Sequence, residues 1–310
     1  MSKYIVTEVN FRPEDLEQLG TKEKFWFRFI AAESEKCMFK FSRADTGEHW
    51  SEKAAEQLAE FLGIPHANYQ LAKCDQRYGV ITQNLIEGES RLVMGNEVLH
   101  QLSPAEYPNP REELLRFVKV REHTVNRVLG CLDLSGVLPP KTKFDLANLT
   151  AGDVFCGYLM LDALISNRDR HHENWAIIVD TSSQQRILCP TYDHASSLGR
   201  ELTDAARERR LRSRDAGFNI SSYLSKAGSL FFKSRADDKP LSTLDAFYTG
   251  VERRERAKRL WLEKLASLEA SHIELVFTRM PNDIMSEVAK EFSIAMVLEN
   301  KRRLLEDERN

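Results

Sequence analysis

Residues 161–199 read LDALISNRDRHHENWAIIVDTSSQQRILCPTYDHASSLG, and this stretch decides the fold that the sequence predicts. It begins with the apolar end of a helix and continues into a loop of polar side chains, namely Asn167, Asp169, His171 and Asn174. The run 175–179, Trp-Ala-Ile-Ile-Val, has the bulky and β-branched residues of a buried strand. A second strand after the Ser-Ser-Gln-Gln turn brings the chain to Asp193. We therefore expect a helix, a loop and a strand hairpin, with a carboxylate just past the second strand.

The spacing of these polar residues is typical of a phosphoryl-transfer site. Such a site needs a carboxylate that orients a hydroxyl, and an amide and a second carboxylate that hold magnesium on ATP. Asp169 and Asn174 are five residues apart, and Asp193 follows the hairpin, as in the catalytic core of protein kinases. Magnesium prefers oxygen ligands, which Asn174 and Asp193 can supply.

Two other interpretations of the same residues stay open. Asn and Asp form turns on their own account, so the polar loop could be an ordinary solvated turn. The second interpretation is a transition-metal hydrolase, with the candidate ligands His171, His172, Glu173, Asp193 and His194. Adjacent histidines seldom reach one ion, and the sequence holds no second histidine cluster to complete a dinuclear site. We therefore favour phosphoryl transfer.

The pattern Asn167-x-Asp169-x-His171-x-x-Asn174, followed by Pro190-Thr191-Tyr192-Asp193, resembles the catalytic core of the HipA-like serine/threonine kinases. The resemblance implies an α+β, bilobed protein-kinase-like fold, with a small antiparallel-sheet N-lobe and a mostly helical C-lobe. It implies dependence on ATP and Mg²⁺. By matching positions, Asp169 is the expected catalytic base, Asn174 and Asp193 the metal ligands, and His171 a buttress of the loop.

The resemblance also suggests partners. Well-known members of that family are toxins of toxin–antitoxin systems that phosphorylate aminoacyl-tRNA synthetases, so we expect a protein substrate, for example such a translation component, and consider an antitoxin partner. The longer relatives carry an extra N-terminal subdomain that contacts the antitoxin. This sequence begins almost directly at the expected ATP lobe, which weakens the toxin–antitoxin expectation.

Lys40 is the candidate for the ATP-binding lysine of the N-lobe. It lies in the apolar run 37–41, where an ammonium needs a partner, although a lysine on an edge strand can instead reach solvent. The next element, 48–61, has the apolar stripe of a helix and carries Glu52 in its first half. A strand lysine paired with a helix glutamate positions ATP phosphates in kinases, and we favour Glu52 over Glu56 for that pair.

Two further positions are expected near the nucleotide. The loop 20–24, with one glycine and Lys24, could cover the phosphates through backbone N–H groups and the lysine, or could be an ordinary hairpin turn. Many HipA-like kinases carry a regulatory serine in this loop, and Thr21 stands here instead. Asn84 lies at the end of the last N-lobe strand, where the adenine edge would meet the main chain.

Composition bounds the class of protein. The chain has 310 residues, 42% hydrophobic and 29% charged, enough for one large domain or two lobes. The net charge of −3 implies no general nucleic-acid affinity, and no apolar run approaches the ~20 residues of a membrane span. The first residues have no apolar segment, so we expect no signal peptide, and five scattered cysteines argue against disulfides and zinc. We expect a cytoplasmic protein that binds no membrane and no nucleic acid directly.

We divide the chain into an ATP-binding N-lobe, 1–88, and a C-lobe with the catalytic loop and metal-binding hairpin, 89–310. N-lobe strands are expected at 4–11, 25–29, 37–41, 67–72 and 78–85. C-lobe helices are expected at 96–101, 111–132, 152–165, 251–268 and 288–306. The segment 200–215 mixes six arginines with four acids, which is typical of a solvated segment. The alternative is that some of its arginines face an acidic or phosphorylated partner.

Overall fold

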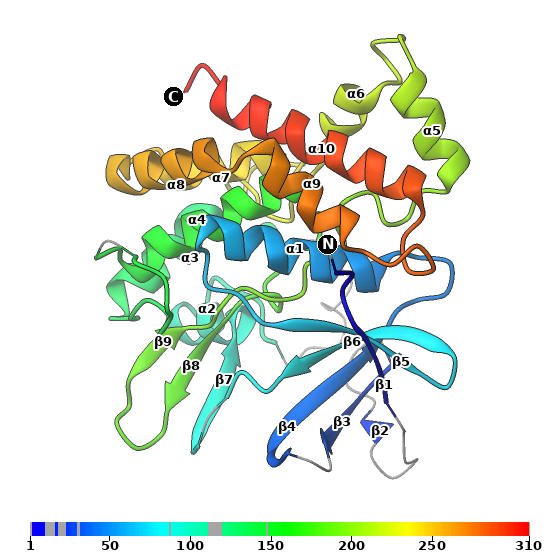
Figure 1. The fold of residues 1–310 in the computed structure, drawn as a ribbon. Coiled ribbons are helices and arrows are strands. Elements are labelled where there is room, and N and C mark those ends of the chain that lie inside the picture. The colour runs from blue at the N-terminus through cyan, green and yellow to red at the C-terminus, as the bar shows by residue number, and fades with distance from the viewer. Residues whose placement is uncertain are drawn as a thin grey trace.

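The computed structural model describes residues 2–9, 16–17, 23–29, 32–86, 88–110, 120–146 and 148–309. Two β-sheets lie on one side of the molecule and most of the helices on the other (Figure 1). This arrangement is the α+β, bilobed architecture that the sequence predicts.

The larger sheet has six strands in the order β1-β5-β6-β4-β3-β2. Their bounds are β1 Val6–Glu8, β2 Leu16–Glu17, β3 Lys24–Phe29, β4 Ala32–Phe41, β5 Tyr69–Cys74 and β6 Arg77–Gln83. The expectation of a purely antiparallel sheet is wrong at one edge, because β1 pairs parallel with β5. A parallel pair needs a long crossover, and here the chain between β1 and β5 contains three strands and a helix.

The alternation of side chains along β4 gives this sheet two different faces. Phe39 and Phe41 point to one face, where Phe39 stacks on Phe25 with ring centroids 5.2 Å apart. Lys40 points to the other face, in a row with its cross-strand neighbours Lys24 and Val80. The strand thus fixes a buried aromatic cluster and turns Lys40 toward the rest of the protein.

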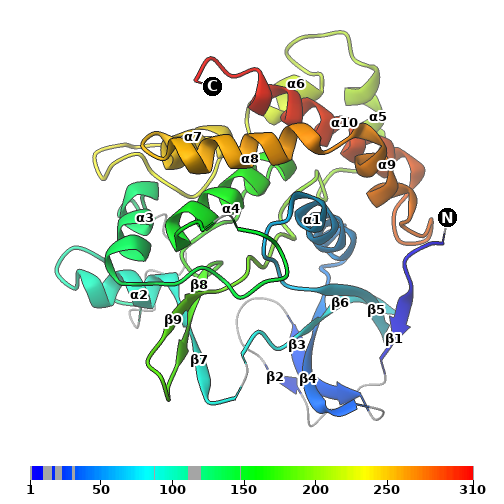
Figure 2. The same cartoon turned by 60° about the vertical axis from the view of Figure 1, so that its left-hand side comes forward.

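Helix α1, Glu48–Leu62, ends at Gly63, whose φ of 62° is the left-handed conformation that glycine adopts without strain. It contacts β5 and β6 on one side and the helices α4, Ala151–Ile165, and α9, Ala270–Thr278, on the other. Figure 2 shows α1 between the large sheet and these helices. The helix therefore joins both halves of the molecule in one core.

The smaller sheet is antiparallel, in the order β7-β8-β9, with bounds Ser90–Met94, Ala176–Asp180 and Arg186–Leu188. It contains the predicted hairpin after the polar loop. Its first strand, β7, leads into helix α2, Gly95–Leu102. Gly95 is required there, because a Cβ would lie 2.2 Å from the indole ring of Trp175.

The other helices are α3 Val125–Leu134, α5 Asp204–Arg212, α6 Ile220–Leu224, α7 Thr243–Val251, α8 Glu255–Ser267 and α10 Glu287–Leu305. Two predicted helix ranges need correction. The range 111–132 is too long, since Thr124 is extended and caps α3 by accepting a hydrogen bond from the Arg127 N–H; residues 111–119 lie outside the described part. The range 251–268 covers the end of α7 and all of α8, separated at 252–254.

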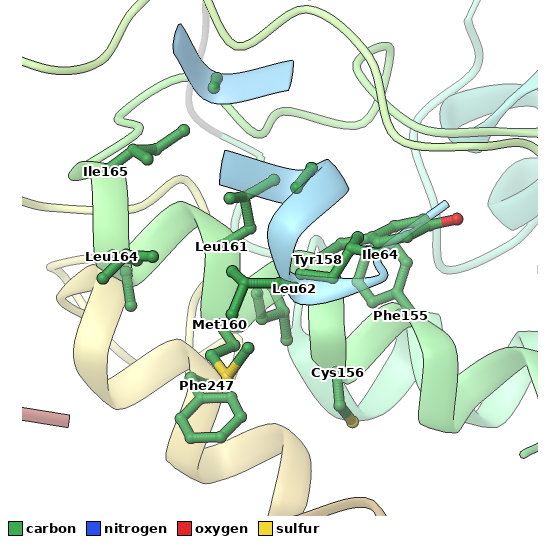
Figure 3. Close-up of a cluster of buried hydrophobic side chains, with 14 of the residues drawn as sticks. Leu62, Ile64, Phe155, Cys156, Tyr158, Met160, Leu161, Leu164, Ile165 and Phe247 are labelled. Carbon is green, nitrogen blue, oxygen red and sulfur yellow. The ribbon is translucent and has the colours of Figure 1, made fainter. Parts of the chain in front are cut away.

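Helix α4 is the centre of the core. Every residue of it except Asp153 is buried, and it contacts α3, α7, α8 and α10. Figure 3 shows Phe155, Met160 and Leu161 of this helix packed with Leu62, Ile64 and Phe247. Burying one such side chain stabilises the fold by about 1.5–3 kcal/mol. Although α4 is this apolar, no helix in the described ranges is long and apolar enough to cross a membrane.

Candidate active site

The polar loop after α4 is organised by a buried ion pair between Arg170 and Asp162. The guanidinium donates through Nε and Nη2 to the two carboxylate oxygens of Asp162, each at 2.8 Å. Both side chains are almost fully buried, at 1% and 5% exposure. Asn167 also donates to Asp162, at 2.7 Å. Removing two charges from water is costly, and this bidentate geometry with further hydrogen bonds is what compensates the cost.

Arg170 also joins the loop to the hairpin. Its Nη1 donates to the carbonyl of Asn174 at 2.6 Å and to the carbonyl of Tyr192 at 3.2 Å. These carbonyls belong to one predicted metal ligand, Asn174, and to the residue before the other, Asp193. One guanidinium therefore sets the positions of both relative to α4. The sequence prediction missed Arg170 and Asp162, although a lone carboxylate in the last turns of an apolar helix was a usable signal.

Asp169 and Asn174 face each other across this loop. The side-chain amide of Asn174 donates to the main-chain carbonyl of Asp169 at 2.6 Å, which fixes the amide nitrogen on that side. The amide oxygen of Asn174 is consequently turned away and can serve as a ligand. The carboxylate of Asp169 is 44% exposed, so a substrate can reach it. This pairing gives one open carboxylate and one oriented amide oxygen.

His171 contacts the loop, as a buttress would. Its Nδ1 accepts a hydrogen bond from the N–H of Glu173 at 3.1 Å, and its Nε2 lies 3.9 Å from Asp169 Oδ1. Its side chain is 34% exposed, and its role as a buttress stays a prediction.

Lys40, on β4 of the larger sheet, contacts Asp193, which lies beyond strand β9 of the smaller sheet. Lys40 Nζ donates to Asp193 Oδ1 at 2.6 Å, across 153 positions of sequence. Burial lowers the pKa of Lys40, but the charges of Asp193 and Glu52 outweigh it, so the pKa lies above its ordinary value and the ammonium stays charged. Asp193 has a φ of 56°, a strained conformation for a residue with a side chain and one that clusters at functional sites.

Glu52 and Glu56 take different positions on α1. Glu52 is 1% exposed, and its charge acts on both Lys40 and Tyr69. Tyr69 in turn accepts a hydrogen bond from the Asp193 N–H at 3.1 Å. Glu56 instead forms a salt bridge with Lys53 at 2.6 Å. Glu52 thus acts on Lys40 electrostatically while Glu56 is paired with Lys53, and Glu52 stays the predicted partner of Lys40.

The remaining predicted nucleotide residues lie at the edges of this region. Lys24 is the direct cross-strand neighbour of Lys40 on β3 and points to the same face of the sheet. Asn84 follows β6, where its N–H donates to the Lys36 carbonyl at 3.0 Å and its side chain accepts from the Ile86 N–H at 3.3 Å. Residues 18–22, with Gly20 and Thr21, lie outside the described residues.

A second set of residues that the sequence prediction missed connects Asp169 to α1. Ser196 Oγ lies 3.4 Å from Asp169 Oδ2, and Arg200 Nη2 lies 3.3 Å from the same Ser196 Oγ. A guanidinium only donates, so the serine hydrogen is directed at Asp169. Arg200 Nη1 then pairs at 3.0 Å with Glu48, which is the first residue of α1 and 4% exposed.

The metal-hydrolase alternative gains nothing from the geometry. His172 Nδ1 is bonded to the Tyr107 hydroxyl at 2.7 Å, and His194 is buried with Nε2 bonded to Thr191 at 2.8 Å. Within the described ranges, no three His, Cys, Asp or Glu side chains gather as ligands for one ion.

Scans against protein-family models and against curated proteins give no match for this chain. Solved structures do resemble it. The proinflammatory kinase CtkA of Helicobacter pylori superposes with a TM-score of 0.74 at 18% identity, covering 97% of this chain and 96% of CtkA. HipA of Shewanella oneidensis, solved with HipB and operator DNA, gives 0.56 at 15% identity, covering 94% of this chain and 65% of HipA. The chain therefore has the HipA-like kinase fold.

Proposed function

We propose that this chain transfers the γ-phosphoryl group of ATP, with Mg²⁺, to a serine or threonine of a protein. One observation supports the proposal above all others. Lys40 of the large sheet meets Asp193 at the end of the hairpin, and the same loop region presents Asp169 with an open carboxylate. A strand lysine, an open aspartate, an amide oxygen and a second aspartate are the parts that phosphoryl transfer requires.

The donor set fits the proposed cofactor. Asn174 and Asp193 offer an amide oxygen and a carboxylate, the hard ligands that Mg²⁺ prefers. Bound Mg–ATP would supply the phosphoryl group and a cation that neutralises its charge. Lys40, with Glu52 behind it, would hold the phosphates, with Lys24 beside it on the sheet. Asn84 would lie at the adenine edge.

Asp169 would act on the acceptor. Its exposed carboxylate would accept a hydrogen bond from the serine or threonine hydroxyl. It would take the hydroxyl proton as the γ-phosphoryl group passes from ATP to the hydroxyl oxygen and ADP is released. Ser196 and the Asn174 amide restrain this residue from two sides, which reduces the entropic cost of alignment. His171 would brace the loop during this step.

A nucleotide-binding regulator without turnover is the second candidate, because a chain that kept the Lys40–Asp193 ion pair would bind nucleotide without a metal ion at that carboxylate oxygen. An ammonium 2.6 Å from a carboxylate competes with a metal ion for the same oxygen. In an active kinase, Asp193 would turn from Lys40 to the metal, leaving Glu52 as the carboxylate beside the lysine. A kinase for a lipid or small molecule is also compatible with these residues, since none of them reads the acceptor.

The wider context of the proposal concerns compartment and partners. All five cysteines are buried and free, which fits a reducing cytoplasm. The HipA neighbour was solved with HipB and operator DNA as a toxin–antitoxin system. We therefore include in the proposal an antitoxin-like partner. A protein substrate such as an aminoacyl-tRNA synthetase is included on the sequence resemblance alone.

The test is incubation of the purified chain with γ-labelled ATP and Mg²⁺, alone and with cell lysate, followed by phosphoamino-acid analysis. The proposal expects label on serine or threonine, lost when EDTA removes the metal. Label on a lipid or small molecule would show that the acceptor is not a protein. Nucleotide binding without any label would favour the regulator, and absence of both label and binding would overturn the kinase proposal.

A further inference from the structure

The segment that follows the hairpin carries a strip of arginines and aromatic rings that the proposed chemistry does not use. Residues 200–226 contain seven Arg or Lys against four Asp or Glu, in a chain whose net charge is −3. Arg168, directly before Asp169, adds another exposed cation at the near end. A local positive surface therefore adjoins the candidate active site of an otherwise acidic protein.

The strip is continuous through cation–π contacts. Arg168 lies 5.9 Å from the centre of the Tyr223 ring, and Arg210 lies 4.9 Å from the same ring. Arg210 is also 4.5 Å from Phe218, and Arg209 is 5.9 Å from Phe218. We name these five residues the arginine strip. It leads from the loop of Asp169 to helix α5.

The rings lie at cation–π distance from the guanidinium groups, and such contacts leave N–H groups available for hydrogen bonds. Stacking engages the flat face of a guanidinium, whereas its N–H groups lie in the plane at the edge. Tyr223 is fixed by its hydroxyl bond to Glu201 at 2.7 Å and by ring contact with Phe292 at 5.8 Å. Arginines fixed in this way lose little conformational entropy when they bind.

Nearby carboxylates do not saturate the strip. Asp204, Glu208 and Glu48 pair with other arginines, namely Arg207, Arg212 and Arg200. Asp215 accepts from the Gly217 N–H at 2.8 Å. Arg168 donates to the Lys226 carbonyl and Arg210 to the Phe218 carbonyl. In the described part of the chain, neither Arg168 nor Arg209 has a carboxylate within salt-bridge distance.

We propose that the arginine strip is a docking surface for an acidic segment of the protein substrate, so that the chain prefers serine or threonine acceptors flanked by Asp or Glu. This inference rests on the proposed function and names its substrate class. Planar N–H forks match carboxylates in two-point contacts. A nucleic acid is less suitable, because the net charge of −3 repels a phosphate backbone outside this strip.

The test compares two peptides that share an acceptor serine, one with Asp and Glu around it and one with Asn and Gln in their place. Wild type should show a kcat/KM about tenfold higher for the acidic peptide, falling with added salt as exposed charge pairs do. The double variant Arg168→Gln/Arg209→Gln should lose this preference and keep its activity on the amide peptide. Equal kcat/KM for the two peptides in wild type would overturn the inference.

A charge-matched control is Arg253→Gln/Arg259→Gln, two exposed arginines elsewhere. It should retain the acidic preference; equal loss in control and strip variant would reduce the effect to net charge and contradict the inference.

A binding measurement separates this outcome from failure of the kinase proposal. Fluorescence anisotropy with labelled acidic peptide, amide peptide and single-stranded oligonucleotide needs no turnover. The inference expects the acidic peptide to bind wild type most tightly, and tighter oligonucleotide binding would refute it.

Discussion

Two charged groups sit next to each other in the loop after α4 and are held in opposite ways. Arg170 is 1% exposed and donates four hydrogen bonds to Asp162, Asn174 and Tyr192. Asp169, one residue earlier, is 44% exposed and accepts a long 3.4 Å bond from Ser196. The buried group uses its hydrogen-bonding capacity inside the protein, and the open one keeps capacity for a substrate. Burial and hydrogen bonding thus distinguish Arg170, which organises the loop, from Asp169, which stays accessible to a substrate.

The largest effect should come from breaking the buried group. Arg170→Met leaves the Asp162 carboxylate buried without its partner and two carbonyls without a donor, so we expect a loss of about 3–5 kcal/mol in unfolding free energy. Urea denaturation measures it. Arg253→Met, at an exposed position, is the matched control and should change stability little. A loss below about 1 kcal/mol for Arg170→Met would show that the pair does not organise the loop.

The next effect concerns pH and two histidines behind the loop. His123 accepts a bond from Trp175 at 3.2 Å, and His172 is bonded to Tyr107. Burial lowers the pKa of His123 to about 3 and of His172 to about 4, from an ordinary 6.5. Below pH 6.5 the unfolded chain takes up protons that the folded chain does not, so stability is full above 6.5 and falls as pH drops toward 4.

We expect these histidines to contribute a few kcal/mol of this acid destabilisation. Unfolding free energies measured from pH 7 to 4.5 check the slope. In His172→Gln the slope should be shallower, whereas in His272→Gln, at a half-buried position on α9 away from the loop, it should match wild type. Identical slopes in all three proteins would contradict the lowered pKa of His172.

The smallest effect should come from the open group's support. Ser196→Ala removes the hydroxyl that Arg200 directs at Asp169, so the carboxylate loses one restraint while the fold keeps its core. We expect kcat to fall about tenfold, equal to about 1.4 kcal/mol, with the KM for ATP unchanged. Ser196→Thr retains a hydroxyl and should recover most of the rate. A raised KM with unchanged kcat would assign Ser196 to nucleotide binding instead.

The same comparison explains what sequence could predict. Asp169, Asn174 and Asp193 could be proposed from the sequence because phosphoryl-transfer sites use those residue types at a spacing that local chain geometry imposes. Lys40 and Glu52 follow from a strand and a helix that local patterns predict well. No local sequence pattern identifies Arg170, because its role depends on Asp162, eight residues earlier, and on the Tyr192 carbonyl.

Other features depend on distant or subtle contacts. The parallel pairing of β1 with β5 places Val6 opposite Leu71, and no local sequence pattern predicts this pairing. The Ser196–Arg200–Glu48 contacts cross 152 positions between Arg200 and Glu48. The range 251–268, predicted as one helix, contains the break between α7 and α8 at 252–254. The sequence does not reveal this break, because the residues there, Glu-Arg-Arg, are all compatible with a helix. In each case the strand pairing, side-chain contact or helix boundary depends on tertiary packing, which local sequence propensity does not determine.

The central claim is that Asp169 acts on the acceptor in a site whose nucleotide contacts come from other residues. The most direct measurement is ATP binding by calorimetry beside phosphoryl transfer in wild type and Asp169→Asn, with Asp283→Asn as the matched surface control. We expect Asp169→Asn to bind Mg–ATP within about twofold of wild type while its transfer rate falls by about 10³ or more. Transfer retained at the wild-type rate in Asp169→Asn would contradict the claim.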